Sequence, residues 1–231
     1  MDFPHSISIL IPIRRELPDV VDNVRGLRLD QAELIVADAG DGPDAAAAYA
    51  ALGARVLTSP GSRGARLRQA AAAASGEILF FLHADSRPPD DALALIRRAV
   101  EGKAAAGAFS LAYAGGGPAL AAIAAWANAR SRWLGLPFGD QGIFCRRDVY
   151  ERAGGIADFS VCDDLDLVWR LRREGPFRIL PEKTVTSPRR YVENGVVRQG
   201  LRNVAVQLGY FAGASPRTLE RWYDRRSELR E

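Results

Sequence analysis

Short apolar runs alternate with segments of helical character along the first half of the chain. The apolar runs are rich in β-branched and aromatic residues, as buried strands are. The predicted strands are residues 7–13, 33–37, 55–57 and 77–82, and the predicted helices are residues 17–29, 43–52 and 61–76. This alternation is typical of an α/β fold whose parallel sheet has right-handed crossovers and helices on both faces.

Polar residues follow three of these strands. The segment Arg14-Arg15-Glu16 comes after the first strand, Asp38 and Asp41 come after the second, and His83-Ala84-Asp85 comes after the fourth. In open α/β sheets, ligands bind at the carboxyl ends of the strands. We therefore expect the functional site at this edge of the sheet.

The second half of the chain does not continue this alternation. A strand is predicted at 106–113, helices at 119–134 and 163–173, an apolar run at 143–145, and a largely helical tail at 194–226. There is no internal repeat and no long segment of disordered character. We expect residues 1–231 to form a single domain, with one half at about 6–105 and the other at about 106–231.

Composition narrows the class of protein. The 231 residues are 48% hydrophobic and carry 31 basic against 28 acidic side chains, a formal net charge of +3. The arginines are spread along the chain, whereas a nucleic-acid binder concentrates basic charge, so no nucleic-acid partner is expected. The preference for arginine over lysine suits recognition of phosphates and carboxylates, and a GC-rich genome would produce the same preference.

Cysteine usage and the first residues favour a cytoplasmic location. Cys145 and Cys162 do not form a C-x-x-C pair, which indicates a reducing compartment. Residues 1–5 run directly into the first apolar run without a basic leader, so no signal peptide is expected. No apolar run reaches the roughly 18 residues that span a bilayer.

The segment after the fourth predicted strand is the strongest chemical signal. Strand side chains alternate, so His83 and Asp85 are expected to point the same way. A carboxylate there, together with diphosphate oxygens, suits a hard octahedral cation such as Mg²⁺ or Mn²⁺. The alternative is that Asp85 caps a helix beginning near Pro88-Pro89.

Six further patterns occur in order along the chain. They are Ile7 to Glu16 with the Asp38 turn, Leu82-His83-Ala84-Asp85, Gly139-Asp140-Gln141-Gly142, Asp163-Asp164, Ser187-Pro188-Arg189-Arg190, and Arg221-Trp222-Tyr223. In these patterns the chain resembles family 2 glycosyltransferases of GT-A fold, in the subgroup with Leu-His-Ala-Asp where most of the family has Asp-x-Asp. That subgroup is sometimes labelled an arsenosugar-biosynthesis glycosyltransferase. The resemblance implies a GT-A-type, Rossmann-like, mostly parallel nucleotide-binding sheet with a helical C-terminal segment.

The resemblance also implies a reaction and the residues that perform it. The reaction is the inverting, metal-dependent, hexosyltransferase-like transfer of a sugar from a nucleotide-diphosphate donor, UDP favoured, to a hydroxyl of a small-molecule or lipid-linked acceptor. No enzyme nucleophile is expected. The implied roles are nucleotide binding for Pro12, Glu16, Asp38, Arg63 and Ala84, metal binding for Asp85 and His83, and general base for Asp164.

The expected sugar and acceptor contacts come from three segments. Gly139, Asp140 and Gln141 offer the mixed donors and acceptors that sugar hydroxyls need. Asp163 joins Asp164 at a helix start, and Arg189 with Arg190 suits a diphosphate or an anionic acceptor. The alternatives are a tight turn in which Asp140 bonds its own backbone, helix capping by the first-turn carboxylates, and a solvated arginine pair.

Two departures from the family pattern stand out. His83 replaces the first carboxylate of Asp-x-Asp, so a metal site would carry less charge. The run Ala70 to Ala74 stands where many relatives have glycine and asparagine. The Gln-x-x-Arg-Trp pattern of processive synthases is absent from the sequence, which favours a single-transfer enzyme.

Other functions remain as alternatives. The loop after the first strand, residues 12–16, has no glycine, which argues against a dinucleotide-binding oxidoreductase and, less strongly, a nucleotidyltransferase. A non-catalytic sugar-nucleotide-binding protein would lack Asp85 or Asp164, and both are present. The segment 119–136 contains two tryptophans, and two interpretations of it are open. It lies on a bilayer surface, or, as we favour, it is buried over the acceptor site.

Overall fold

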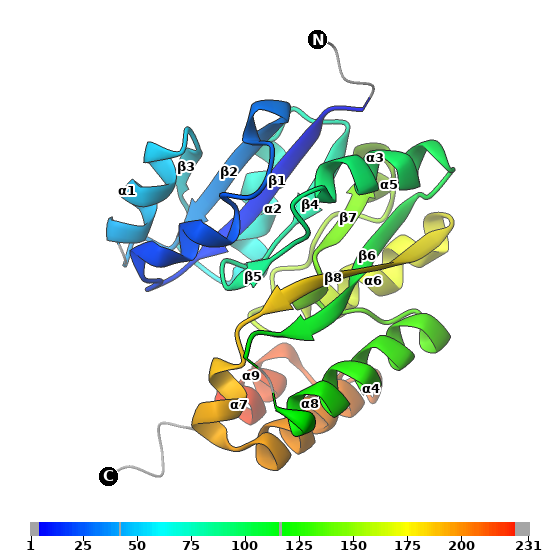
Figure 1. The fold of residues 1–231 in the computed structure, drawn as a ribbon. Helices are drawn as coiled ribbons and strands as arrows, with labels where there is room; N and C mark the ends of the chain where they lie inside the picture. The colour runs from blue at the N-terminus through cyan, green and yellow to red at the C-terminus, as the bar shows by residue number, and fades with distance from the viewer. Residues whose placement is uncertain (1–4, 42, 116, 225–231) are drawn as a thin grey trace.

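The chain was analysed as a computed structural model, which describes residues 5–41, 43–115 and 117–224. Within these residues eight strands form one sheet in the order β3-β2-β1-β4-β7-β6-β8-β5 (Figure 1). The strands are β1 (Ile7–Ile13), β2 (Ala32–Asp38), β3 (Arg55–Thr58), β4 (Ile78–Phe81), β5 (Ser86–Arg87), β6 (Ala106–Tyr113), β7 (Ile143–Arg146) and β8 (Phe177–Thr186).

The sheet is mostly parallel, as the alternation of strands and helices predicts. Strand β1 pairs in parallel with β2 and β4, β2 with β3, and β6 with β8. Strand β7 runs antiparallel between β4 and β6, and β5 runs antiparallel to β8. Because β7 comes from the second half of the chain and lies beside β4 of the first, the sheet continues across both halves.

Helices cover both faces of this sheet (Figure 1). They are α1 (Pro43–Ala51), α2 (Arg63–Ala73), α3 (Ala92–Glu101), α4 (Pro118–Leu134), α5 (Arg147–Arg152), α6 (Asp163–Glu174), α7 (Arg189–Asn194), α8 (Val196–Phe211) and α9 (Pro216–Asp224). Alternate side chains of β1 serve the two faces: Ile9 and Ile11 belong to one buried cluster with α1 and α3, and Leu10 to another with α2, α5 and α6.

One predicted helix is wrong. Residues 17–29 form a short 3₁₀ helix, η1 (Pro18–Asn23), followed by turns and a second one, η2 (Leu29–Gln31). Their backbone bonds span three residues, as from the N–H of Val24 to the carbonyl of Val21 at 3.1 Å. Several β-branched residues and Gly26 lower the α-helical propensity of this segment, so the tighter turns prevail.

Strand β8 has no counterpart in the sequence prediction. It contains Pro181 followed by Glu182 and Lys183, so neither an apolar run nor a clean alternation announces it. Its parallel pairing with β6 shifts register between Ala108 and Ser110, which accommodates the irregularity.

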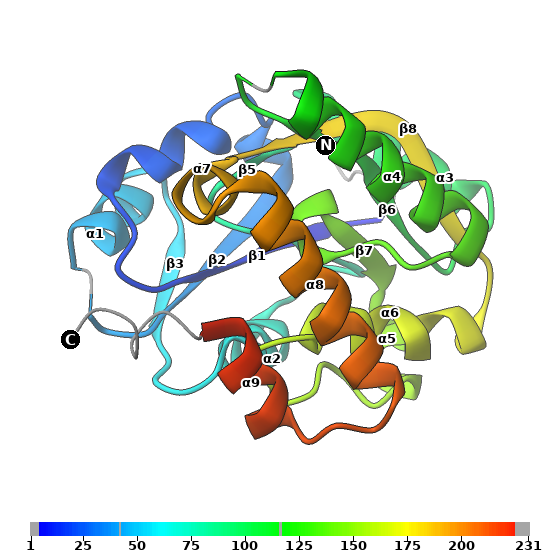
Figure 2. The same ribbon diagram turned by 90° about the horizontal axis from the view of Figure 1, so that it is seen from below.

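The C-terminal helices form a layer below the sheet as drawn in Figure 1, beside α4. Seen from below, α8 crosses this layer next to α9 (Figure 2). A small cluster of Cys162, Leu165, Val206 and Leu219 joins them to α6. The predicted helical tail is confirmed as far as residue 224, and residues 225–226 of that prediction lie outside the described residues, as do residues 1–4 of the predicted leaderless start. Among the described helices, none has the length and apolar character to cross a membrane.

Candidate functional site

A cavity of about 790 Å³ lies at the carboxyl ends of β1 and β4 and extends under the C-terminal helices. This is the edge at which open α/β sheets bind ligands. Most of the predicted site residues line it, namely Pro12, Glu16, Arg63, His83, Ala84, Asp85, Asp140, Asp164, Arg189 and Arg190. The cavity-lining set does not include Asp38, Gly139, Gln141 or Asp163.

The segment after β4 reaches the cavity from a turn. Strand β4 ends at Phe81, and the N–H of Ser86 donates to the carbonyl of His83 at 3.1 Å. The expectation from strand alternation therefore does not apply, although both His83 and Asp85 line the cavity. Helix α3 begins at Ala92, preceded by Asp91, so the capping interpretation of Asp85 is wrong. The Asp85 carboxylate receives only a long contact from the Ser86 hydroxyl, at 3.5 Å, among the described hydrogen bonds.

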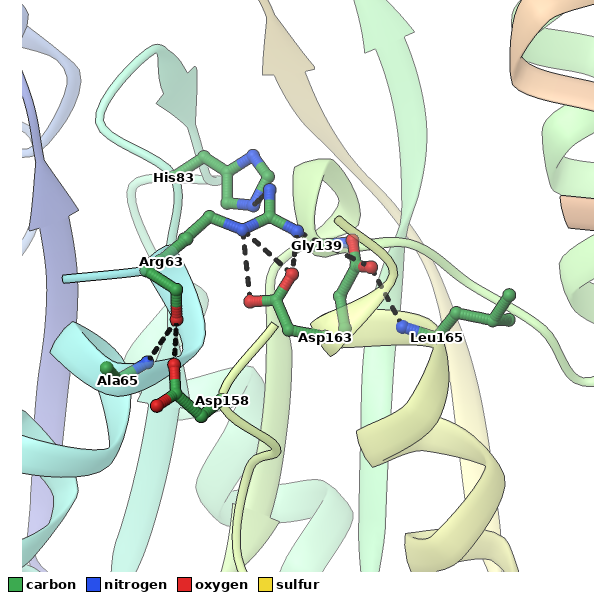
Figure 3. Close-up of polar contacts among 9 residues, drawn as sticks. Arg63, Ala65, His83, Gly139, Asp158, Asp163 and Leu165 are labelled. Carbon is green, nitrogen blue, oxygen red and sulfur yellow. Dashed lines mark hydrogen bonds and ion pairs between the residues drawn. The ribbon is translucent and has the colours of Figure 1, made fainter. Parts of the chain in front are cut away.

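His83 is a neutral imidazole that faces Arg63 (Figure 3). Its Nε2 lies 3.1 Å from Nη1 of Arg63. Burial and the Arg63 charge lower the pKa of His83 to about 4. Because a guanidinium only donates, Nε2 accepts this hydrogen bond and the proton of the neutral ring is on Nδ1. Any metal ligation through Nε2 would have to displace Arg63.

Arg63 is held by a buried carboxylate. It begins α2 directly after Ser62, whose hydroxyl accepts from the N–H of Ala65 at 3.0 Å as a helix cap. Nε of Arg63 lies 3.0 Å from each carboxylate oxygen of Asp163 (Figure 3). Asp163 is fully buried, with 0% exposure. The pair fixes the start of α2 against the start of α6, and Asp163 is therefore occupied by Arg63 and does not line the cavity.

Asp164 presents an ionised carboxylate to the cavity. Its Oδ2 accepts from the N–H of Gly139 at 2.7 Å and its Oδ1 from the N–H of Leu165 at 2.8 Å. Burial raises the pKa of Asp164, but Arg63 and these backbone donors outweigh burial and hold it below the usual value. A β-carbon at position 139 would lie 2.4 Å from Nε2 of His83 and 3.0 Å from Oδ2 of Asp164, so this approach requires glycine.

Asp140 brings a buried carboxyl group to the wall of the cavity. It lies in the 3₁₀ turn η3 (Gly139–Gln141), and its buried Oδ1 has no hydrogen-bond partner among the described residues. Burial raises its pKa to about 6, against the opposing charge of Arg130. The tight-turn interpretation, in which this carboxylate bonds its own backbone, gains no support from Oδ1. A buried oxygen without a partner beside a cavity is free to accept a hydrogen bond from a ligand.

Gln141 differs from the prediction because its amide is fully engaged inside the protein. Its Oε1 accepts from the Ser131 hydroxyl at 2.8 Å and from the N–H of Phe138 at 3.2 Å. Its Nε2 donates to the carbonyl of Phe109 at 2.8 Å. Gln141 therefore shapes the turn that carries Asp140 and has no free group for an acceptor.

Two acidic residues lie at the ends of β1 and β2. Asp38 pairs with Ile13 in register, and its Oδ1 is buried without a hydrogen-bond partner in the part of the chain that the structure describes. Glu16 lines the cavity; burial raises its pKa, and the charges of Arg189 and Arg190 oppose that rise. An acceptor oxygen at Asp38 and a carboxylate at Glu16 suit the N–H and hydroxyl groups of a nucleoside.

The cavity also contains residues that the sequence did not single out for binding. Arg130, on α4, stacks over the Phe138 ring at 3.8 Å and opposes the charge of Asp140. Arg66 has a buried Nε without a hydrogen-bond partner. Because Arg66 follows Arg63 by one turn of α2, the sequence could have indicated that it also faces the cavity. No sequence signal connects Arg130 with residue 140, because only the packing of α4 against the sheet brings them together.

The family comparison agrees with this architecture. The sequence model of the family described as "Glycosyl transferase family 2" matches residues 8–140. That span includes β1 through the turn that carries Asp140. No curated protein sequence matches the chain.

Three solved structures illustrate the likeness of fold. A mannosyltransferase from Pyrobaculum calidifontis, in complex with GDP-Man and Mn²⁺, has a TM-score of 0.61 at 18% identity over 89% of this chain and 62% of its own. Glucosyl-3-phosphoglycerate synthase from Mycobacterium tuberculosis, with Mn²⁺ and UDP-glucose, has a TM-score of 0.56 at 19% identity over 87% of this chain and 78% of its own. TarS 1-349 from S. aureus, with UDP-GlcNAc, has a TM-score of 0.63 at 11% identity over 79% of this chain and 58% of its own. These likenesses confirm the predicted GT-A-type fold, and the chain spans less than two thirds of the first and third of these proteins.

Proposed function

The chain belongs to glycosyl transferase family 2, and from this premise we propose that it transfers a sugar from a nucleotide-diphosphate donor to an acceptor hydroxyl, with inversion and with a divalent metal ion. One observation carries the proposal. A single cavity gathers the carboxylates of Asp85 and Asp164 and the guanidinium groups of Arg189 and Arg190 from separate parts of the chain. Because both halves of the chain line this cavity, it also supports the expectation of one domain.

The donor nucleotide belongs at the ends of β1 and β2. Glu16 lies there in the cavity, between Pro12 and the turn that holds Ala84. The partnerless oxygen of Asp38 suits an N–H on the edge of a base, such as N3–H of uracil. A UDP-sugar remains the favoured donor, because the resemblance is to family 2, in which UDP is the commonest donor type. GDP-Man, UDP-GlcNAc and UDP-glucose occur in structures of similar fold.

The metal ion belongs at Asp85. Its carboxylate is in no ion pair with a described residue and receives only the long Ser86 contact, so it has lone pairs available. A hard cation such as Mg²⁺ or Mn²⁺ would take this oxygen, diphosphate oxygens and water. When bound, the ion would neutralise charge on the departing diphosphate. His83 fits this role less well than the sequence suggested, because Nε2 accepts from Arg63.

The displacement needs a base and anion-stabilising groups. Asp164, ionised at neutral pH, is proposed to take the proton of the acceptor hydroxyl. The acceptor oxygen then forms its bond to the anomeric carbon as the bond to the diphosphate oxygen breaks, and the electron pair leaves with the diphosphate. Arg189 and Arg190 are proposed to stabilise that leaving charge, and Asp140 to accept a hydrogen bond from a sugar hydroxyl.

The acceptor is a small molecule or a lipid-linked one. The subgroup label of arsenosugar biosynthesis is a lead for the small-molecule case and rests on the resemblance of motifs alone. The cavity offers both kinds of acceptor the same chemistry, since Asp164 needs only a hydroxyl within hydrogen-bonding reach.

The test measures which product the protein forms from a panel of UDP-, GDP- and ADP-sugars with Mn²⁺. Water or an added alcohol serves as a substitute acceptor, and free nucleoside diphosphate is quantified. We expect slow diphosphate release from one base class, lost in Asp164→Asn and retained in the matched surface control Asp90→Asn. Release of pyrophosphate in a parallel reaction supplied with a nucleoside triphosphate and a sugar 1-phosphate would identify a nucleotidyltransferase. Binding of a sugar nucleotide without any diphosphate release would identify a non-catalytic sugar-nucleotide-binding protein.

A further inference from the structure

Helix α8 carries an apolar stripe that no described part of the chain covers. Val197, Leu201, Val204, Leu208 and Phe211 follow one another at intervals of three or four residues, so they share one face of the helix. All five are exposed, Val197 to 74% and Leu208 to 65%. The opposite face buries Gln199, Val206 and Gly209 against the protein.

Helix α4 adds two exposed tryptophans to the same layer of helices. Trp126 is 64% exposed and Trp133 is 82% exposed, whereas Leu120, Ala124 and Ala127 are buried. We expected this helix to be buried over the acceptor site. It does line the cavity, but both tryptophans are largely exposed. Helices α4 and α8 contact each other, and both lie at the surface seen in Figure 2.

The candidate active site opens on this apolar face. Trp126 of α4 and Val204 of α8 line the cavity and are also exposed, so they mark its mouth. A substrate that enters between these helices passes the exposed apolar side chains before it reaches Asp164.

The two helices that form the apolar face carry charge of one sign, and the nearby carboxylates Glu193 and Glu220 lie on the neighbouring helices α7 and α9. Neither α4 nor α8 contains an aspartate or a glutamate. Arg132 and Arg198 are exposed on these helices, and neither forms an ion pair with a described residue. The face therefore combines exposed tryptophan and aliphatic side chains with unneutralised arginines.

We propose that the α4–α8 face docks on a lipid bilayer that contains anionic lipids. Tryptophans concentrate at membrane interfaces, and amphipathic helices with apolar and arginine side chains lie in the interface plane. Anionic headgroups would supply the negatively charged partners that Arg132 and Arg198 do not have among the described residues. A second copy of the chain fits less well, because it would bring the arginines of α4 and α8 against one another, and neither helix has a carboxylate to pair with them. The inference that the acceptor is presented at the bilayer, in front of the cavity mouth, rests on the proposed function.

Vesicle binding tests this inference without any knowledge of donor or acceptor. The full chain is sedimented with vesicles of phosphatidylcholine alone and with vesicles of equal parts phosphatidylcholine and phosphatidylglycerol, at low and at high salt. We expect binding to the anionic vesicles only, weakened by salt. The double variant Trp133→Ser with Leu208→Ser, both outside the cavity lining, is expected to bind at least about tenfold more weakly. The matched control is Leu17→Ser, which removes an equally exposed leucine (66%) far from α8 in the chain.

Three outcomes overturn the inference. One is the absence of binding to anionic vesicles, and another is equal binding by the double variant. The third is a dimer in sedimentation velocity that the double variant abolishes, since the face would then be an interface between copies. Nucleoside-diphosphate binding by the same preparations is measured separately: if it persists while vesicle binding fails, the docking inference falls and the proposed function stands.

Discussion

Replacement of Asp140 by asparagine tests the electrostatics of the site most sharply. Asp140 lies between Gly139 and Gln141 in the turn η3, and its buried Oδ1 has no hydrogen-bond partner among the residues that the structure describes. Burial raises its pKa from 3.8 to about 6, despite the neighbouring Arg130. An asparagine of the same shape removes the charge and keeps the packing. The folded protein should therefore gain stability wherever Asp140 is ionised.

The magnitude follows from the difference between the folded and unfolded pKa. Each pKa unit corresponds to about 1.4 kcal/mol, so ionisation of Asp140 costs the folded state about 3 kcal/mol once both states are deprotonated. The sign is that of a raised carboxyl pKa. The free energy of unfolding is highest below about pH 4, where Asp140 is protonated, and the contribution of this group is lost as the pH rises through about 6. Asp140→Asn should match the parent protein near pH 4 and exceed it by about 2 to 3 kcal/mol at pH 8.

The assay is equilibrium denaturation of the parent and Asp140→Asn at both pH values, in EDTA and without nucleotide. In a chain of this length the gain corresponds to a rise in Tm of roughly 4 to 12 °C. Asp148→Asn is the matched control, because Asp148 pairs with Arg146 and Arg152, which lower its pKa, so its loss should reduce stability slightly at pH 8. An equal effect of Asp140→Asn at pH 4 and pH 8, or a loss of stability at pH 8, would refute the reasoning. The same variant should bind the donor sugar more weakly, since a neutral amide with one acceptor oxygen replaces the carboxylate proposed to accept its hydroxyl.

Three further substitutions test neighbouring parts of the site. Asp164→Asn should lower kcat at least about 100-fold with nearly unchanged donor affinity, and a kcat within threefold or so of the parent would remove Asp164 from the role of base. Gly139→Ala should cost about 1 to 3 kcal/mol in denaturation and lower kcat, because its β-carbon would displace His83; an active variant of parental stability would contradict the close approach. Asp163→Asn should cost about 3 to 5 kcal/mol, because it leaves Arg63 without its buried counter-charge, and a change under about 1 kcal/mol would show that the pair is unimportant to the fold.

The sequence predicted most of the sheet because its strands are apolar on both faces. Strands β1, β2 and β4 read as continuous apolar runs, and each is buried between two layers of helices. The sequence did not predict β8. The residues of this strand alternate irregularly and include Pro181, and its conformation depends on pairing with β6. The prediction of an α-helix at residues 17–29 was also wrong. Apolar residues there have helical spacing, but the β-branched residues and the glycine favour tighter turns.

The candidate site was predictable to the extent that strand ends carry it. Asp85 and Glu16 follow β4 and β1 directly, so the rule that ligands bind at the carboxyl ends of strands was sufficient. The pairing of Arg63 with Asp163 joins residues a hundred positions apart and depends on how α2 meets α6. For the same reason, the sequence placed Asp163 among the acceptor contacts although Arg63 occupies it, and only the family resemblance singled out Asp164, which lines the cavity.

The most direct test of the central claim is calorimetric titration of the full chain with UDP, GDP and ADP, first with Mn²⁺ and then with EDTA. The account predicts that one of these diphosphates binds, that EDTA weakens binding at least about tenfold, and that Asp85→Ala does the same with Mn²⁺ present. The control Asp90→Ala, an exposed carboxylate in the segment after β5, should bind as the parent does. If no diphosphate binds with Mn²⁺, or if Asp85→Ala binds as tightly as the parent, the assignment of this cavity as a metal-dependent nucleotide-sugar site is contradicted.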